Sequence, residues 1–359
     1  MSLSAFNSPV KVLIADDSAF MRTALSRMVQ SDDSLCVVGT AQTGPETLTQ
    51  IDRLQPDVVT LDLDMPGFSG LEVLKRVMHD SPRPFIVISS LAQEGAEATL
   101  EALELGAFDC LAKRINYGSL DIVKVQDELV GKIKAAAHSR GNARRYSRRV
   151  HRPFSPPAPS LSLCTPAVVA IGTSTGGPKA LQEVLPALPA DLPVGVVIVQ
   201  HMPPGFTGPL AKRLDALCHV HVHEAEAGMA LARGHVYLAP AGQHLTLRRC
   251  SPTQVVMHVS STPSDVPHIP SVDIMMLSVA EVFRSLAMGI ILTGMGADGA
   301  LGMQAIFREG GLTVGQDEAT CTVYGMPRTC AEMGVLKRVV PLPEIPRQIL
   351  SALGYRIAQ

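Results

Sequence analysis

The sequence predicts an α/β protein made of two doubly wound domains, each with a largely parallel sheet. Two observations support this prediction. Short apolar runs rich in β-branched and aromatic residues alternate with helical stretches along the chain, which is typical of parallel strands in βα units. The 359 residues also exceed what a single hydrophobic core usually organises, so two domains are expected.

The first domain is predicted over residues 9–138, as five strand–helix units around a five-stranded parallel sheet of flavodoxin-like size. The apolar runs predict strands at Val10–Ala15, Val58–Leu61, Phe85–Ile88 and Phe108–Leu111. The helical patterns fall at Ser18–Gln30, Gly44–Leu54, Gly70–His79, Glu94–Leu105 and Ser119–His138.

A linker is predicted over residues 139–166. The segment contains six arginines, then a group of prolines, and no acidic residue, so it cannot bury a core. Two interpretations remain open for it. It is either a solvated spacer extended by charge repulsion and proline, or a docking segment for an acidic partner surface.

The second domain is predicted over residues 167–355, again α/β, doubly wound and mostly parallel. A hairpin-like stretch near His244–Val259 is the one antiparallel part, and a helix begins at Val272. Strands are expected at Val168–Gly172, Val194–Gln200, Val220–Glu224, His235–Pro240, Gly289–Gly294 and Leu312–Gln316.

Composition excludes several classes of protein. A content of 46% hydrophobic and 18% charged residues predicts an ordinary soluble globular protein, and a net charge of −2 argues against nucleic acid as a partner of the whole protein. The seven cysteines are scattered and form no Cys-x-x-Cys pair, so neither disulfides nor a zinc site is predicted. No leader peptide and no run of about 18 apolar residues is present, so we expect a cytoplasmic protein without membrane insertion.

In the first domain, polar residues stand where apolar runs end. They are Asp16, Asp17, Asp62, Ser89 and Lys113. The carboxyl ends of parallel strands share one edge, so these groups are expected to meet there. Three carboxylates suit Mg²⁺, and a carboxylate beside an ammonium can accept a phosphoryl group. Taken alone, any one of them could instead be a helix cap, as Asp17 before Ser18 would be.

The segments VLIADDS, TLDLDMPGFSG, VISSL and ALELGAFDCLAK resemble the receiver domains of two-component response regulators. The resemblance implies that Asp62 accepts a phosphoryl group from a sensor histidine kinase and that Ser89 and Lys113 act as switch residues. The implied Mg²⁺ ligands are Asp16, Asp17, Asp62 and the backbone carbonyl of Asp64. The chain departs from the family at Arg114, where proline is usual, and at Cys110, where many receivers have an aromatic residue.

In the second domain, a glycine-rich turn follows the first strand. Ser174 stands within Gly172–Gly177, and this turn could expose a nucleophilic serine, cradle a phosphate or simply be tight. A serine nucleophile needs a base and an orienting acid, and His201 and Asp298 also follow apolar strands. Asp298 could equally belong to a plain Asp-Gly turn. His219, His221 and His223 alternate along one strand and fit surface or interface residues better than metal ligands, because no carboxylate pair accompanies them.

The order Ser, His, Asp disfavours an α/β-hydrolase lipase or esterase. The segments IGTSTGGPKAL, VQHMPPGFTGPLAKRL, GHVYLAPAGQHL, PSVDIMMLSVA, ILTGMGADGA and QDEATCTVYGMP are similar to the catalytic domain of the bacterial chemotaxis protein-glutamate methylesterases (CheB-type), which are also glutaminases. The resemblance implies a triad of Ser174, His201 and Asp298, with Thr175 and Met295 at the oxyanion and substrate pocket. Ile269 stands where related sequences often have arginine.

We therefore expect a phosphorylation-activated serine hydrolase. It would remove methyl groups from glutamate methyl esters of methyl-accepting chemotaxis receptors and deamidate receptor glutamines, with Mg²⁺ needed only for phosphorylation. The alternative is a receiver-controlled nucleotide-binding or scaffold module, which would have no use for His201 and Asp298. A DNA-binding regulator is disfavoured because the second domain is too long and strand-rich for a helix-turn-helix module.

Overall fold

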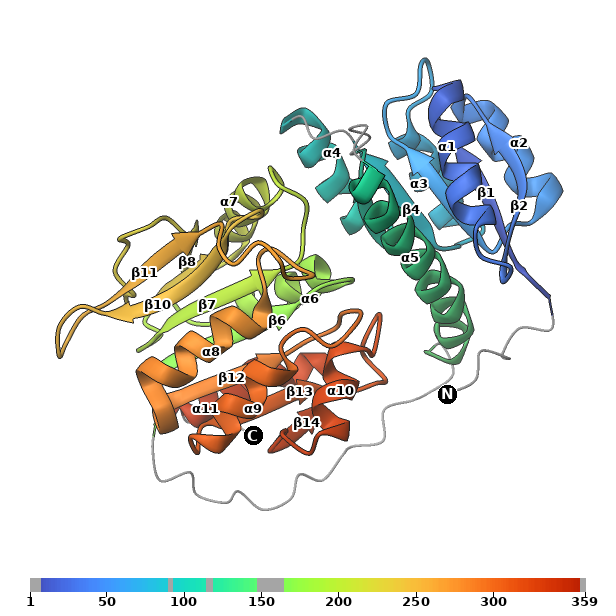
Figure 1. The fold of residues 1–359 in the computed structure, drawn as a ribbon. Coiled ribbons are helices and arrows are strands. Elements are labelled where there is room, and N and C mark those ends of the chain that lie inside the picture. Colours follow the sequence, from blue (N-terminus) through green and yellow to red (C-terminus); the bar gives the residue numbers. More distant parts are fainter. Residues whose placement is uncertain (1–7, 90–92, 114–118, 147–164, 356–359) are drawn as a thin grey trace. The chain divides into compact units, whose positions relative to one another are not determined.

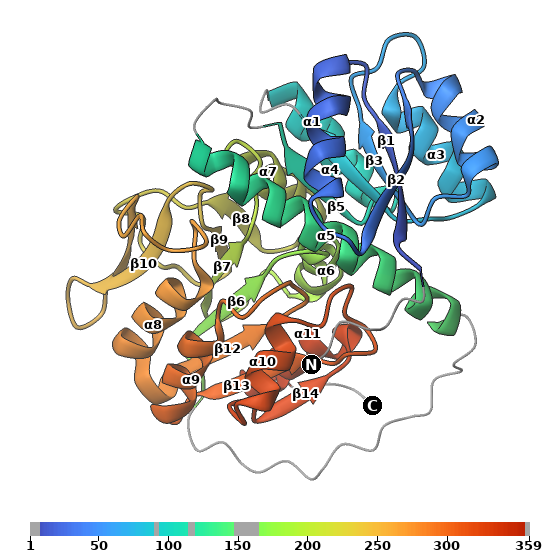
Figure 2. The same cartoon turned by 45° about the vertical axis from the view of Figure 1, so that its right-hand side comes forward.

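The computed structural model describes residues 8–89, 93–113, 119–146 and 165–355. The chain divides into an N-terminal unit, Met1–Pro153, and a C-terminal unit, Phe154–Gln359, each with its own sheet (Figures 1 and 2). We describe each unit by itself.

The N-terminal unit is a parallel five-stranded sheet with helices on both faces (Figure 1). The strand order is β2-β1-β3-β4-β5, as expected for a doubly wound domain. Its strands are β1 (Val10–Ala15), β2 (Leu35–Ala41), β3 (Val58–Asp62), β4 (Phe85–Ser89) and β5 (Asp109–Ala112). Its helices are α1 (Ala19–Gln30), α2 (Gly44–Leu54), α3 (Gly70–Asp80), α4 (Gln93–Glu104) and α5 (Ser119–Tyr146).

Helix α5 is the main departure from the predicted elements of this unit. It continues to Tyr146, whereas the sequence predicted that the helix ends at His138 and that a linker follows. Three of the eight residues from Ser139 to Tyr146 are arginines, which are good helix formers, so the lack of acidic residues did not mark the end of the helix. Most of the predicted linker, residues 147–164, lies outside the described residues.

The C-terminal unit has a parallel seven-stranded sheet in the order β14-β13-β12-β6-β7-β9-β8, and a separate antiparallel hairpin, β10–β11. The prediction of a mostly parallel α/β domain with one antiparallel hairpin is confirmed. The strands are β6 (Val168–Thr173), β7 (Gly195–Gln200), β8 (His221–Glu224), β9 (His235–Leu238), β10 (His244–Arg249), β11 (Val255–Ser260), β12 (Ala287–Ile291), β13 (Leu312–Gln316) and β14 (Arg338–Val340). The α-helices are α6 (Gly177–Val184), α7 (Thr207–Leu217), α8 (Val272–Phe283), α9 (Ala300–Arg308), α10 (Met326–Glu332) and α11 (Ile345–Ala352), with short 3₁₀ turns at Leu185–Ala187, Arg284–Leu286 and Leu342–Glu344.

Helix α8 belongs to a hydrophobic core cluster of this unit. Its apolar residues pack against β6, the hairpin strand β10 and helix α9, and Met275, Met276 and Val279 are fully buried. Ser271 caps its N-terminus by accepting a hydrogen bond from Ile274 N. Burial on several sides fixes this helix, so the groups at its N-terminus are rigidly placed.

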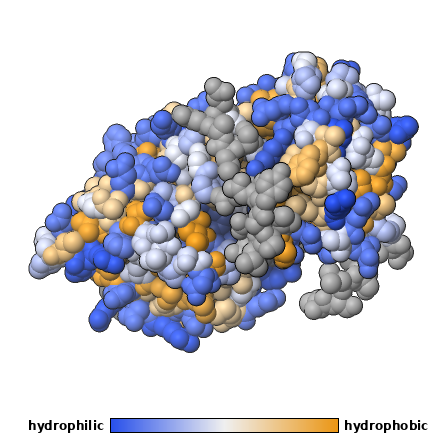
Figure 3. Space-filling view, turned by 45° about the horizontal axis from the view of Figure 1, so that its top comes forward, coloured by the Kyte–Doolittle hydropathy of each residue, from blue (hydrophilic) through white to orange (hydrophobic). Residues whose placement is uncertain are grey.

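No helix within the described ranges is both long and apolar enough to span a membrane. On the face shown in Figure 3, hydrophobic residues are interspersed with hydrophilic ones in both units.

Candidate functional site

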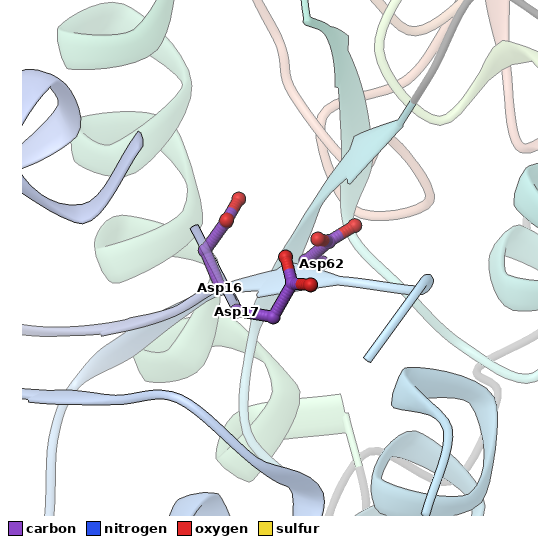
Figure 4. A group of neighbouring side chains, drawn as sticks. All are labelled: Asp16, Asp17 and Asp62. Carbon is purple, nitrogen blue, oxygen red and sulfur yellow. The ribbon is translucent and has the colours of Figure 1, made fainter. Parts of the chain in front are cut away.

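The acidic residues predicted at the strand ends of the N-terminal unit do come together. The carboxylates of Asp16, Asp17 and Asp62 offer oxygen atoms that all lie within 4.8 Å of one another, at the ends of β1 and β3 (Figure 4). Asp16 and Asp62 are 0% and 1% exposed, whereas Asp17 is exposed. Two buried carboxylates and one accessible carboxylate therefore form one cluster.

Lys113, which follows β5, supplies the positive charge of this cluster. Its Nζ lies 2.6 Å from Asp62 Oδ2 and 3.2 Å from Asp16 Oδ2. Burial opposes the charged ammonium, but the hydrogen bond and charge of Asp62, together with the charge of Asp16, raise the pKa of Lys113. Burial, aided by the charge of Asp16, raises the pKa of Asp62. One ammonium thus only partly compensates the buried carboxylates.

The cluster fits a hard divalent cation. Of the three carboxylates, only those of Asp16 and Asp62 pair with an ammonium, and the Arg22 guanidinium reaches only the Asp16 and Asp17 backbone carbonyls, so the carboxylate oxygens remain available to a divalent ion. Asp16 Oδ2 is buried and, apart from its ion pair with Lys113, has no hydrogen-bond partner within the described part of the chain. Asp64 is exposed and its N–H donates to Asp62 Oδ1 at 3.2 Å, which ties the following loop to the cluster.

Ser89 ends β4 and is buried, as expected for a residue at this edge. Its hydroxyl donates to the Gly95 carbonyl at 3.1 Å, and Thr99 Oγ1 donates to Ser89 Oγ at 2.6 Å. Ser89 therefore couples β4 to helix α4, and Thr99 is a buried partner that the sequence did not single out. Cys110 is buried in β5, and burial raises its pKa to about 12, so it stays a neutral thiol. Arg114 lies outside the described residues.

In the C-terminal unit, Ser174 is half-buried in a tight turn after β6. Its carbonyl accepts hydrogen bonds from Gly177 N at 2.8 Å and Gln200 Nε2 at 2.9 Å. Gly176 adopts φ +79°, and a Cβ there would meet the Thr322 hydroxyl at 2.4 Å. A Cβ on Gly294 would come within 2.8 Å of the Ser174 Cβ. Both glycines therefore allow the backbone to pack closely around the serine.

His201 and Asp298, predicted at the same edge, are in direct contact. His201 Nε2 lies 2.8 Å from Asp298 Oδ2, and their side chains are only 11% and 9% exposed. Burial opposes the carboxylate charge, but the hydrogen bond and charge of His201 and backbone N–H donors lower the pKa of Asp298 well below its usual range. Asp298 is therefore an ionised partner for the imidazole at neutral pH.

The N-terminus of α8 holds the Asp298 carboxylate. Oδ2 accepts a hydrogen bond from Val272 N at 2.7 Å, and Oδ1 accepts from Ser271 Oγ at 2.8 Å and Asp273 N at 3.0 Å. Helix N-termini favour negative charge because their first N–H groups lack intrahelical partners. Asp298 therefore does more than form an Asp-Gly turn, because its carboxylate binds the start of α8.

A second carboxylate, Asp273, mirrors this arrangement. It lies in the first turn of α8, and its Oδ1 accepts a hydrogen bond from Gly302 N in the first turn of α9 at 2.8 Å. Burial raises the pKa of Asp273. The sequence pattern does not single out this residue. In the sequence, Asp273 is an acidic residue shortly after the cap Ser271, a pattern that indicates the start of a helix. This pattern carries no information about a contact with another helix.

A second histidine packs against the ring of His201. The ring of His268 stacks on that of His201, with centroids 4.3 Å apart and planes at 18°. His201 Nδ1 is buried and has no hydrogen-bond partner among the residues described. With Nε2 bound to a carboxylate, the proton belongs on Nε2, and Nδ1 is left as the basic atom. The described residues show no hydrogen bond between Ser174 Oγ and His201.

Thr175 and Met295 lie on the two loops that flank Ser174. Thr175 is 3% exposed, and its carbonyl accepts a hydrogen bond from Thr293 Oγ1 at 2.9 Å. Met295 follows Gly294, whose carbonyl accepts from Gly325 N and Met326 N at 3.0 Å each. These contacts fix the loops around the serine. Gln200 Nε2 donates to the backbone carbonyls of both Ser174 and His201, at 2.9 Å each, which ties the serine turn to the start of the histidine loop.

Two protein families match this chain. Residues 169–349 match the CheB methylesterase family, and residues 12–123 match the response regulator receiver domain. The two matches correspond to the C-terminal and N-terminal units.

Relatives are similar over nearly the whole chain. A protein-glutamate methylesterase/protein-glutamine glutaminase 1 of Oleidesulfovibrio alaskensis is 43% identical, over 96% of this chain and 99% of the relative. A protein-glutamate methylesterase/protein-glutamine glutaminase of Geobacillus kaustophilus is 44% identical over 96% and 99%. The crystal structure of the Thermotoga maritima CheB methylesterase catalytic domain is 39% identical and superposes with a TM-score of 0.51, covering 52% of this chain and 98% of that structure.

Proposed function

This chain belongs to the CheB methylesterase family, with a response regulator receiver domain preceding the catalytic domain, and from that premise we propose that Ser174, His201 and Asp298 form its catalytic triad. The family makes the chain a phosphorylation-regulated methylesterase and glutaminase. Chemoreceptors are its general class of substrate and a kinase its general source of phosphoryl groups. The proposal assigns the chemistry to particular atoms.

The proposed reaction is acyl transfer through the serine. Ser174 Oγ attacks the carbonyl carbon of a glutamate γ-methyl ester, and His201 Nδ1 takes the hydroxyl proton. The tetrahedral intermediate expels methanol, which receives that proton, and water then hydrolyses the acyl-enzyme in the same way. A glutamine amide follows the same course and releases ammonia. The serine and the imidazole come into hydrogen-bonding distance when substrate binds, a tightening that is common in such sites.

The observation that carries this proposal is the hydrogen bond of 2.8 Å between His201 Nε2 and the buried Asp298 carboxylate. It fixes the tautomer in which Nδ1 is the base and stabilises the imidazolium formed during attack. A nucleotide-binding or scaffold module has no need for a buried imidazole held by an ionised carboxylate. The backbone N–H groups beside Thr175 and Met295 are the proposed donors to the oxyanion.

For the receiver domain we propose Asp62 as the phosphorylated residue, with Lys113 and Ser89 as the switch residues. Asp16, Asp17, Asp62 and the Asp64 carbonyl would hold Mg²⁺, which neutralises phosphoryl charge when it is bound. Lys113 Nζ, 2.6 Å from Asp62, orients the carboxylate and neutralises its charge. Ser89 would leave Gly95 to bond the phosphoryl group, and this exchange would loosen α4 from β4.

An active-serine probe tests the hydrolase assignment. A fluorophosphonate should label the full-length protein at one serine, mapped to Ser174 by peptide mass spectrometry, and labelling should be lost in Ser174→Ala. Ser285→Ala is the matched control, because Ser285 is exposed at the opposite end of α8. Labelling that persists in Ser174→Ala would reject Ser174 as the nucleophile.

Methanol release from methylated receptor membranes tests the regulatory assignment. A small phosphodonor with Mg²⁺ should raise the rate of the wild-type protein. Asp62→Asn should remove this response and leave the unstimulated rate unchanged, because Asp62 belongs to the other unit and takes no part in ester hydrolysis. A full response in Asp62→Asn would show that another residue is phosphorylated.

A further inference from the structure

Three histidines gather at one edge of the seven-stranded sheet, away from the proposed triad. His221 and His223 lie on β8, the edge strand, and His235 lies on the neighbouring strand β9. The strands are parallel, with His221 paired with His235 and His223 paired with Tyr237. Since side chains alternate along a strand, the three histidines share one face of the sheet.

The three rings lie close together, with His235 nearest to both of the others. His223 Nε2 lies 2.9 Å from His235 Nδ1, and these two rings are nearly parallel, at 16°. Ring centroids are 5.0 Å apart for His221 and His235, 5.2 Å for His223 and His235, and 6.4 Å for His221 and His223. Two imidazole nitrogens therefore already face each other, with a third imidazole beside them.

Charge limits what this cluster can be. A hydrogen bond between two imidazoles needs one ring to be neutral, and protonating all three would place like charges side by side. Neutral imidazole is the form that binds metals, and its preferred ions are the borderline cations Zn²⁺, Ni²⁺ and Cu²⁺.

We propose that His221, His223 and His235 form a binding site for a divalent transition metal such as Zn²⁺. Zn–N bonds are about 2.0–2.1 Å long, so a tetrahedral ion holds two ligand nitrogens about 3.3 Å apart. His223 Nε2 and His235 Nδ1 face each other along the line that joins their ring centroids, so both rings must turn as well as separate before their lone pairs converge on one ion. The His221 ring, with its centroid 5.0 Å from that of His235, must turn toward the same point. The hard oxygen cluster of Asp16, Asp17 and Asp62 differs in ligand chemistry and would prefer Mg²⁺.

Tyr237, the remaining group in the ring cluster, is not a ligand. Its hydroxyl donates to the Ala230 carbonyl at 2.8 Å and accepts from Ala232 N at 3.2 Å, so it is already committed to the loop before β9. The site is therefore all nitrogen. The prediction from the sequence took the histidines of one strand by themselves and disfavoured metal binding. It could not include His235, because the pairing of β8 with β9 is not visible in the sequence.

A metal at this site would join β8 to β9. Edge strands have one unpaired side and are held only by their inner neighbour. A bridge of His221 and His223 to His235 would tie the short strand β8 to the sheet through its side chains as well as its backbone. The inferred role is structural, and it does not depend on the assignment of the triad.

Isothermal titration calorimetry with Zn²⁺ on the full-length protein tests the proposal. Excess Mg²⁺ is present throughout, so that the aspartate cluster is filled. One Zn²⁺ per chain should bind, and His223→Gln and His235→Gln should each weaken binding at least tenfold. His219→Gln is the matched control, since His219 is an exposed neighbour outside the ring cluster, and it should bind as the wild type does.

Thermal unfolding gives a second readout. Zn²⁺ should raise the Tm of the wild type and of His219→Gln, and should leave that of the His223→Gln/His235→Gln double variant unchanged. Metal-free melting of every variant checks that the fold is intact. The proposal is overturned if the wild type binds no Zn²⁺, or if the double variant binds Zn²⁺ as tightly as the wild type.

Discussion

Asp298 and Asp273 hold the N-termini of two helices in a reciprocal way: Asp298, which precedes α9, accepts hydrogen bonds from the start of α8, and Asp273, which belongs to α8, accepts one from the start of α9. The donors to Asp298 are the N–H groups of Val272 and Asp273, and the donor to Asp273 is the Gly302 N–H. The same exchange holds the carboxylate that contacts His201. Two helix N-termini are thus locked together at the point where the proposed triad needs rigidity.

Asp273→Ala should therefore impair catalysis, although Asp273 does not reach the substrate. Losing the cap frees the Asp298 loop, and the resulting misplacement should lower kcat by about tenfold to a hundredfold with little change in KM. Asp273→Asn keeps an oxygen acceptor for Gly302 N and should retain most of the activity. Rates of methanol release from methylated receptors measure both effects.

A capping variant in the other unit separates positioning from stability. Ser69 caps α3 through a capping box, and Ser69→Ala should cost about 1 kcal/mol in the free energy of unfolding without changing kcat. If Asp273→Ala kept the wild-type kcat, Asp273 would have only a structural role.

Asp298→Asn should reduce kcat by about 10³- to 10⁴-fold, because the amide cannot hold His201 in the tautomer with Nδ1 as the base. It should also destabilise the fold in a pH-dependent way. The folded-state pKa of Asp298 is lowered, so its stabilising effect is present above the unfolded value of about 3.9 and is lost as the pH falls through the folded value.

The difference in Tm between wild type and Asp298→Asn should consequently narrow below pH 4. Thermal melts from neutral pH to below pH 4 measure it. A difference that closes between pH 7 and pH 5 would mean that the carboxylate titrates there, contrary to its four hydrogen-bond donors in the structure.

Ser174→Ala and His201→Ala should each lower kcat by several orders of magnitude, and the double variant should be hardly slower than either. Residues that act as one unit show this non-additivity, because removing one leaves the other without a role. Single-turnover methanol release, with circular dichroism to verify folding, measures it. Additive losses would indicate that the two residues act in separate steps.

Much of both sites could be predicted because the residues stand where strands end. Asp62 and Ser89 are the last residues of β3 and β4, and His201 directly follows β7, so chain-local patterns placed them at the functional edges. His268, Asp273, Thr99 and His235 could not be found in this way. Each of these residues contacts a partner on another helix, strand or loop. Such contacts depend on how the elements pack, which the hydrophobic periodicity of the sequence does not encode.

Lys113→Met should destabilise the N-terminal unit, because it leaves the buried carboxylates of Asp16 and Asp62 without their cation. Removing one partner of a buried ion pair costs about 3 kcal/mol or more in the free energy of unfolding. Lys75→Met is the control. Lys75 pairs with Glu101 at 2.9 Å, but both side chains are about half exposed, so its loss should be close to neutral.

Both pH and Mg²⁺ should change how much stability Lys113→Met loses. The pKa of Asp62 is already raised by burial, so without Lys113 the penalty grows as pH rises above the unfolded value and shrinks as the carboxylate protonates at lower pH. Mg²⁺ should raise the urea midpoint of Lys113→Met more than that of the wild type, because the ion replaces the missing charge. Urea titrations at pH 5 and pH 7.5, with and without Mg²⁺, measure these changes. A Lys113→Met protein as stable as Lys75→Met would show that the ammonium does not compensate the two carboxylates.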